Sequence, residues 1–194
     1  MKKPTVQLWT RNFTLVTIAT ALGAAGGIAG GFALSFLVFD ETGSTLASAL
    51  IVAIQLVPNI FIPFLVAPLM DRLPRKAFLV GGDICNGIVY GGMGLWLMEF
   101  DFSYVGYLGI SVLLACLSSV DRLAYTSIYP QLIPNGAEQK GYAVSSMLYP
   151  ILTVIMTPLA AVLLDTLGVP LLLVLQGALS LAAALTESFI RLEE

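Results

Sequence analysis

Long apolar stretches follow one another along almost the whole chain, and they constrain its fold more than any other feature. Six of them can be drawn, at residues 13–39, 46–70, 77–98, 104–120, 142–164 and 169–190. A helix that crosses about 30 Å of hydrocarbon needs roughly 20 residues, and each stretch is of that order. None alternates apolar and polar residues as a transmembrane β-strand does. The pattern predicts an all-α membrane protein with six transmembrane helices.

The scarcity of charge agrees with this prediction and excludes several classes of function. Only 11% of the 194 residues are charged and none is histidine, whereas a soluble domain carries roughly 25% charged residues. The sequence has no phosphate-binding glycine loop, no cluster of metal ligands and no nucleophile paired with a base. We therefore expect no enzyme activity, no catalytic residues, no cofactor, no metal and no nucleic-acid partner.

The basic residues fall on one side of the predicted topology. They precede the first span, lie in the even-numbered connections, or follow the last span: Lys2, Lys3, Arg11, Arg72, Arg75, Lys76, Arg122, Lys140 and Arg191. The charged residues of the opposite connections are all acidic: Asp40, Glu41, Glu99, Asp101 and Asp165. Because cytoplasmic loops are enriched in Lys and Arg, the sequence predicts a multi-pass protein of the plasma (inner) membrane with both termini in the cytoplasm.

Glycines in the first span recur four residues apart, as in the pairs Gly23/Gly27, Gly26/Gly30 and Gly27/Gly31. Glycine at this spacing lets two helix backbones approach closely in lipid. We expect tight packing here, and a smooth contact of this kind would also permit sliding or rocking.

The second span contains three prolines and two amides, Gln55 and Asn59, which are four residues apart. Each proline removes a backbone donor, and the freed carbonyls need a partner in protein or in a water-filled cavity. The span therefore lines a polar cavity or forms hydrogen bonds between helices; the sequence leaves both open.

Asp83 lies seven residues beyond Lys76, or about 10 Å into the third span. Ionisable residues at such depth usually face the protein interior, and Arg122 approaches the same depth from the fourth span. The sequence leaves three interpretations open. Asp83 and Arg122 form a static buried ion pair, they form an ion pair that breaks and reforms during transport, or Asp83 takes up protons. Glu187 stands four residues before Arg191, which predicts a helix-end ion pair.

The charged connection at residues 67–76 resembles the cytoplasmic signature of the major facilitator superfamily, Gly-x-x-x-Asp-Arg-x-Gly-Arg-Arg/Lys. Four of its positions match: Asp71, Arg72, Arg75 and Lys76. Ala67 and Pro74 replace glycines of the pattern. Residues 36–68 and 130–134 also look like the branch that exports macrolides and siderophores.

The resemblance implies a conformational latch, made by the four matched residues together with Asp121 at the inner end of the fourth span. It also implies that residues 1–194 are the N-terminal six-helix bundle, built from 3+3 inverted repeats, of a two-half fold whose C-terminal half is absent from this sequence. Substrate would bind between the halves, and the expected lining residues are Gln55, Asn59, Tyr125 and Tyr149. Asp83 would then be the candidate for proton coupling.

The expected function is secondary active efflux of amphipathic small molecules by alternating access. The expected partners are the substrate, the lipid bilayer, and either a C-terminal six-helix half or a second copy of the chain. Two alternatives remain: a half-size transporter that works as a homodimer, and a non-transporting six-helix scaffold or assembly module. The latch motif counts against a scaffold, because a latch is unnecessary without two states.

Overall fold

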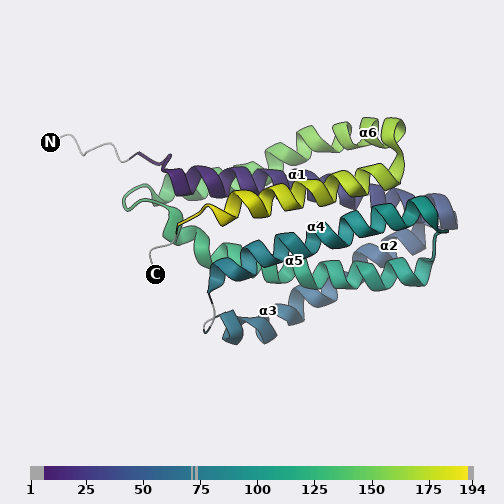
Figure 1. Cartoon of the computed structure of the whole chain (residues 1–194), viewed down its shortest axis with the longest axis horizontal. Coiled ribbons are helices and arrows are strands. Elements are labelled where there is room, and N and C mark those ends of the chain that lie inside the picture. Colours follow the sequence, from purple (N-terminus) through teal and green to yellow (C-terminus); the bar gives the residue numbers. More distant parts are fainter. Residues whose placement is uncertain (1–6, 71, 73, 192–194) are drawn as a thin grey trace.

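The computed structural model describes residues 7–70, 72 and 74–191, and the described chain is entirely helical (Figure 1). Its helices are α1 (Arg11–Thr42), α2 (Thr45–Ile54), α3 (Leu56–Met70), α4 (Arg75–Glu99), α5 (Tyr104–Leu132) and α6 (Glu138–Ser188). Gln55 alone separates α2 from α3. With α2 and α3 counted as one broken helix, the described residues form five helices.

A tight reversal joins α1 to α2. Gly43 ends α1 in the left-handed conformation (φ 62°), and its backbone N–H donates to the Phe39 carbonyl at 2.8 Å. Ser44 then begins α2, since its hydroxyl accepts a hydrogen bond from the Ala47 N–H at 3.3 Å. Glycine after a helix and serine before one are the usual capping residues, so the sequence itself specifies this turn.

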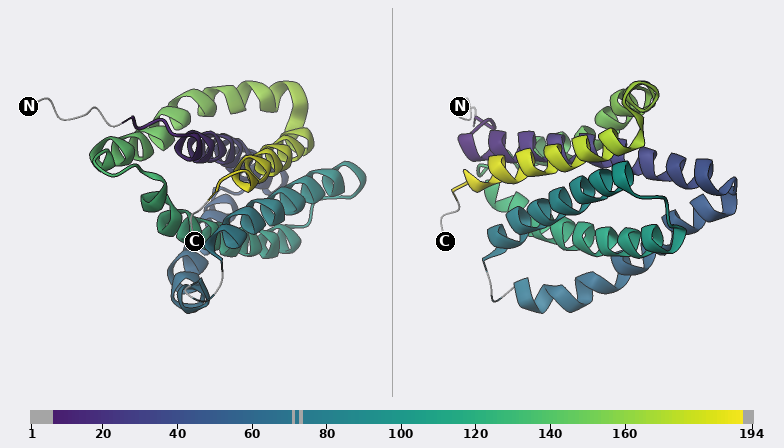
Figure 2. Two further views of the ribbon diagram at one scale, coloured as in Figure 1. Left: turned by 60° about the vertical axis from the view of Figure 1, so that its left-hand side comes forward. Right: turned by 45° about the vertical axis from the view of Figure 1, so that its right-hand side comes forward.

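Helix α6 bends back on itself at Gly168. Its 51 residues would span about 77 Å if straight, more than twice the hydrocarbon thickness of a bilayer. Gly168 has φ 76° and ψ 169°, a conformation essentially restricted to glycine. The two arms, residues 138–167 and 169–188, therefore run in opposite directions (Figure 2).

Helix α6 makes the most extensive helix contacts, with α1 and with α4, and its second arm packs against both. Glycines make the approach close. A Cβ added to Gly26 would lie 2.5 Å from Gln176 Oε1, and one added to Gly94 would lie 2.6 Å from the Pro170 carbonyl oxygen. The tight packing expected from the glycines of the first span is thus formed by Gly26 and Gly30, which both meet Gln176.

One end of the bundle gathers the start of α1 and the ends of α3, α5 and α6, while the α1–α2 turn, the α4–α5 turn and the bend of α6 lie at the other end (Figure 1). Contacts bind the first of these ends together. Asn12 exchanges two hydrogen bonds with the backbone of Arg191, and Lys76 Nζ donates to the carbonyls of Ser188 and Ile190 at 2.7 Å each. The described basic residues outside the helix interiors therefore share one end.

Four segments in the described part of the chain are long and apolar enough to cross a bilayer: Arg11–Thr42, Thr45–Met70, Tyr104–Leu132 and Glu138–Ser188. These segments indicate a membrane protein. The prediction of six separate spans is not reproduced.

Three differences from the predicted spans have physical causes. The predicted spans 142–164 and 169–190 correspond to the two arms of α6, which Gly168 joins directly, with non-helical φ and ψ and no intervening loop. The predicted third span coincides with α4, which is long enough but is made less apolar by polar residues such as Asp83 and Asn86. In addition, α5 continues well past the predicted limit of residue 120, because Asp121 and Arg122 do not interrupt it.

Candidate functional site

A cavity of about 760 Å³ lies between the helices and has walls from α1, α2, α3, α4, α5 and both arms of α6. Small-molecule sites in proteins usually have volumes of roughly 300–1,000 Å³. The cavity has three distinct parts, namely a buried polar end, a smooth wall and an open rim.

The buried polar end is formed by Asp83 and Asn86 of α4, Asp121 of α5, and Gln176 and Ser180 of the second α6 arm. Asp83 and Asn86 are each 8% exposed, Gln176 is 4% exposed and Ser180 is 3% exposed. Their spacings, 83/86 and 176/180, put each pair on one face of its helix. This spacing was the available sequence signal for Asn86, Gln176 and Ser180, which our sequence analysis missed.

Several oxygens at the polar end lack hydrogen bonds. Asn86 Oδ1, Asp121 Oδ1 and Gln176 Oε1 are buried and have no hydrogen-bond partner among the described residues. Buried polar atoms are normally paired, because an unmade hydrogen bond costs about 1–3 kcal/mol. The polar end therefore holds hydrogen-bond acceptors that no donor in the described part of the chain satisfies.

The smooth wall is a glycine face of α1. Gly23, Gly27 and Gly31 line the cavity, and a Cβ added to any of them would meet nothing within 4 Å. The glycines of α1 thus serve two purposes, since Gly26 and Gly30 pack against α6 while the other three leave room. Leu34 and other apolar side chains continue this wall.

The open rim contains Gln55, Asn59 and Tyr149, three of the four residues expected to line a cavity. Tyr149 is 61% exposed. Asn59 also accepts a hydrogen bond from Ser119 Oγ at 2.8 Å, so it contacts a neighbouring helix and borders the cavity as well. Their role toward a substrate stays a prediction.

Tyr125, the fourth expected lining residue, is not part of the cavity wall. Its hydroxyl lies 3.2 Å from Ser145 Oγ, and its ring centroid lies 5.0 Å from that of Tyr129. It joins α5 to the first arm of α6 near the end of the bundle that carries the basic residues.

Asp83 and Arg122 both border the cavity but do not form an ion pair in the described structure. Asp83 is buried, as expected for an acidic residue at this depth. Arg122, expected to be buried, is instead exposed at the rim, where it also faces Asn59 and Ser119. Consecutive side chains on a helix point about 100° apart, so Arg122 points away from its neighbour Asp121, which faces Gly82 of α4.

Glu187 was expected to pair with Arg191, and this interaction is not formed between these described residues. Helix α6 ends at Ser188, so Arg191 is not on the helix, and Asn12 holds its backbone instead. Glu187 is only 3% exposed, its Oε2 lacks a hydrogen-bond partner in the described part of the chain, and it lies near enough to Asp83 and Asp121 to interact electrostatically. Three carboxyl groups therefore gather inside the bundle.

The expected latch is only partly described. Asp71 lies outside the described residues. Arg72 is exposed in the turn, and Arg75 Nη1 contacts the Ser127 carbonyl oxygen at 3.5 Å. Lys76 holds the end of α6, as described above.

Asp121 lies apart from the α5 residue that Arg75 reaches. It packs against α4, where a Cβ on Gly82 would be 3.4 Å from its Oδ1. Ser127, the α5 residue that Arg75 reaches, is six residues farther along the helix, or about 9 Å. In this structure Asp121 belongs to the polar end of the cavity.

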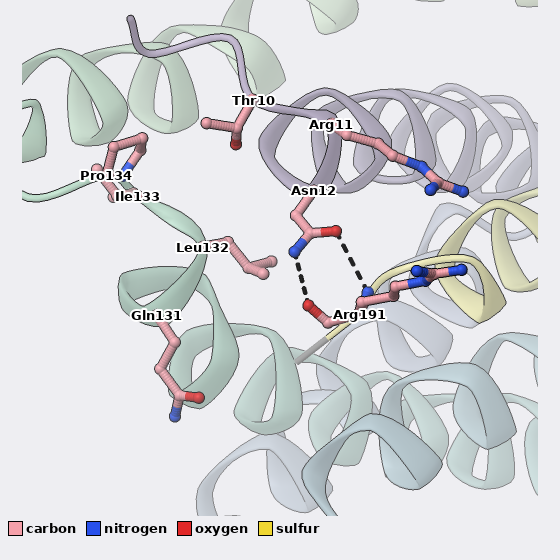
Figure 3. A pocket seen from close by; sticks show the side chains of 8 residues that line it. All are labelled: Thr10, Arg11, Asn12, Gln131, Leu132, Ile133, Pro134 and Arg191. Carbon is pink, nitrogen blue, oxygen red and sulfur yellow. Dashed lines mark hydrogen bonds between the residues drawn. The ribbon is translucent and has the colours of Figure 1, made fainter. Parts of the chain in front are cut away.

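A second pocket, of about 780 Å³, lies at the end of the bundle with the chain termini (Figure 3). Arg11 and Arg191 border it, together with the Asn12 side chain that binds the Arg191 backbone at 2.6 and 3.2 Å. The hydrogen bonds of Asn12 are directed at the chain itself, so this pocket is best explained as the join between the start of α1 and the segment that follows α6.

No group of three His, Cys, Asp or Glu side chains in the described residues has the geometry to hold a metal ion. Neither a protein-family model, nor a curated protein, nor a solved structure matches this chain.

Proposed function

We propose that this chain is the N-terminal half of a secondary transporter of the major facilitator type, which exports amphipathic small molecules by alternating access. The observation that carries the proposal is the cavity, which has a buried polar end, a smooth glycine wall and a rim open on one side. A site of this kind near the middle of a helical bundle is where such transporters bind substrate.

The proposed topology has six crossings. Each arm of α6 crosses once, because the arms are antiparallel and each is long enough for about 30 Å of hydrocarbon. Helix α4 crosses as well, since its polar side chains Asp83 and Asn86 face the protein interior and not lipid. Polar residues inside a membrane are tolerated in that position. The two groups of three crossings would form the 3+3 inverted repeats.

The open rim implies a partner that completes the cavity. Asn59, Arg122 and Tyr149 are exposed there, and a guanidinium at this depth would be costly against hydrocarbon. A C-terminal six-helix half supplies the missing wall in our proposal, and a second copy of the chain is the alternative. Rocking of the two walls would expose the cavity to each side of the membrane in turn.

Cysteine accessibility tests alternating access directly. Cys85 and Cys116 are first replaced by serine, and single cysteines are then introduced at Gly31 or Ser35 in the cavity wall of the native full-length protein. Labelling by a membrane-impermeant maleimide is measured from each side, in right-side-out and inverted vesicles. A cysteine at Val105, which is 81% exposed and outside the cavity, is the matched control.

Alternating access predicts that each cavity cysteine reacts from both sides of the membrane, with rates that a bound substrate changes. The Val105 cysteine should react at one rate whether or not substrate is present. Labelling of the cavity positions from a single side under all conditions would contradict transport and favour the scaffold alternative.

A further inference from the structure

We propose that the cavity binds an organic cation, with its positive end group at Asp83, Asp121 and Asn86 and its apolar body along the glycine wall of α1. This names the substrate class of the proposed transporter and rests on that proposal for its physiological meaning. The binding site itself is argued from the contacts, burial and charges of the cavity.

The unsatisfied atoms at the polar end are all acceptors. Asn86 Oδ1 and Asp121 Oδ1 lack hydrogen-bond partners among the described residues, and both side chains line the cavity. Gln176 Oε1 is also unpaired there but lies against Gly26 of α1. Asn86 and Gln176 are more than nine-tenths buried, so bulk water does not freely satisfy them. Carboxylate and amide oxygens together match a ligand that carries N–H donors and a positive charge.

The charged groups near the cavity are mostly acidic, which also favours a positively charged ligand. Asp83 and Asp121 border it, and Glu187 interacts electrostatically with both. The basic group of the described cavity wall is Arg122, which is exposed at the rim and forms no ion pair with these carboxyl groups. Buried carboxyl groups ionise readily only beside a compensating charge, and a cationic ligand provides one.

The remaining walls suit an apolar body. Gly23, Gly27 and Gly31 leave open space, and Leu34, Ile51 and Val52 present hydrocarbon to the cavity. A bulky neutral group can therefore lie along α1 while its charged end reaches the acceptors on α4 and α5. Since the polar end is buried and the rim is open, the ligand enters with its positive end first.

Matched fluorescent probes test the sign of the charge. Dansylcadaverine ends in an ammonium group, and dansyl-6-aminohexanoic acid has the same fluorophore on a similar chain that ends in a carboxylate. Binding of each to the native full-length protein in nanodiscs of zwitterionic lipid is measured from the rise in dansyl fluorescence, after subtraction of empty nanodiscs. We expect saturable binding of dansylcadaverine that is at least tenfold tighter than that of the carboxylate probe.

Isosteric variants locate the site. Asp83→Asn and Asp121→Asn should each weaken dansylcadaverine binding by at least tenfold, whereas Asp165→Asn, at an exposed position outside the cavity, should leave it unchanged. Thermal unfolding of each variant shows whether it is folded. If one variant is unstable, the other variant and the probe preference of the unmodified protein still decide the question.

Three outcomes would overturn the cation site: equal or tighter binding of the carboxylate probe, no saturable binding of either probe, or unchanged binding to both folded Asp→Asn variants. This failure is distinguishable from failure of the transport proposal. If the cavity cysteines react from both sides but dansylcadaverine does not bind, the transport proposal stands and the cation site is rejected. If dansylcadaverine binds specifically but the cavity cysteines are labelled from one side alone, the cation site stands and the transport proposal is rejected.

Discussion

Gly177 of α6 lies directly against Gly87 of α4: a Cβ on Gly177 would stand only 2.7 Å from the Gly87 carbonyl oxygen. No side chain fits between the two backbones at this point. Because apolar side chains gain little by leaving lipid, close backbone approach is a principal source of helix association in a membrane. The position of the second α6 arm, and with it the placement of Gln176 and Ser180 in the cavity, therefore depends on these two glycines.

Gly87→Ala should weaken this contact. The new Cβ would lie 2.7 Å from Leu181 Cγ and 3.0 Å from the Gly177 carbonyl oxygen, and overpacking of this kind costs about 1–3 kcal/mol. We expect a lower thermal unfolding midpoint in detergent. Gly92→Ala is the matched control on the same helix, since its Cβ would meet nothing within 4 Å. Equal midpoints for the two variants would show that α4 and α6 are not packed in this way.

The sequence predicted that glycines of α1 pack closely, but not which of them pack against α6 and which line the cavity. Spacing of four residues identified the face of α1 that bears Gly23, Gly26, Gly27, Gly30 and Gly31. It could not show that Gly26 and Gly30 meet Gln176 while the others border open space. That division depends on where the second arm of α6 packs, and contacts between residues as far apart in the sequence as Gly26 and Gln176 leave no periodic signal.

The candidate site was predictable where the signal was local. Gln55 and Asn59 were identified from their common helix face, and Asp83 from its depth in an apolar stretch. An ion pair between Glu187 and Arg191 was predicted because the two residues are four positions apart, but this spacing brings side chains together only within a continuous helix. Helix α6 ends between them, so the carboxyl group remains inside the bundle with Asp83 and Asp121.

Gly27→Phe should fill the cavity without disturbing the helix packing. A Cβ at Gly27 would meet nothing within 4 Å, so a large side chain can project into the cavity. We expect at least tenfold weaker binding of dansylcadaverine in the nanodisc assay, with an unfolding midpoint close to that of the unmodified protein. Gly109→Phe on α5, also in open space but not part of the cavity wall, is the control. Undiminished binding to Gly27→Phe would place the ligand elsewhere.

Lys76→Met should loosen the end of α6. The ammonium group of Lys76 donates to the Ser188 and Ile190 carbonyls at 2.7 Å each, where the helix leaves carbonyl groups without intrahelical partners. Loss of both hydrogen bonds should cost about 1 kcal/mol at this partly exposed position. Amide hydrogen exchange at residues 184–188 should then be roughly fivefold faster.

Lys140→Met provides the comparison for the α6 end. Lys140 is exposed at the beginning of the same helix, and its replacement removes one positive charge without touching residues 184–188. Exchange in that segment should match the unmodified protein. A similar acceleration in both variants would mean that net charge, and not the Lys76 hydrogen bonds, holds the helix end.

Binding of dansylcadaverine should weaken as the pH falls, because protons and the ammonium group compete for the same carboxylates. Glu187 interacts electrostatically with Asp83 and Asp121, and Tyr90 and Arg122 line the same cavity. Displacement of one proton would change the dissociation constant by up to tenfold per pH unit. The constant is measured in nanodiscs from about pH 8 to about pH 5, and the double Asp→Asn variant should lose most of the slope. An equally steep slope in that variant would assign the proton to another group.

Arg122→Gln should tighten cation binding, because it removes the basic side chain that stands at the exposed rim of the cavity. The gain should be about two- to fivefold at low salt and should disappear near 1 M salt, where the Debye length is about 3 Å. Lys140→Gln removes the same charge at an exposed position outside the cavity and should change binding little. If Arg122 instead contributes to the ligand site as a hydrogen-bond donor, its replacement would weaken dansylcadaverine binding at all salt concentrations. The direction of this change therefore tests the charge balance of the cavity without altering any of its carboxyl groups.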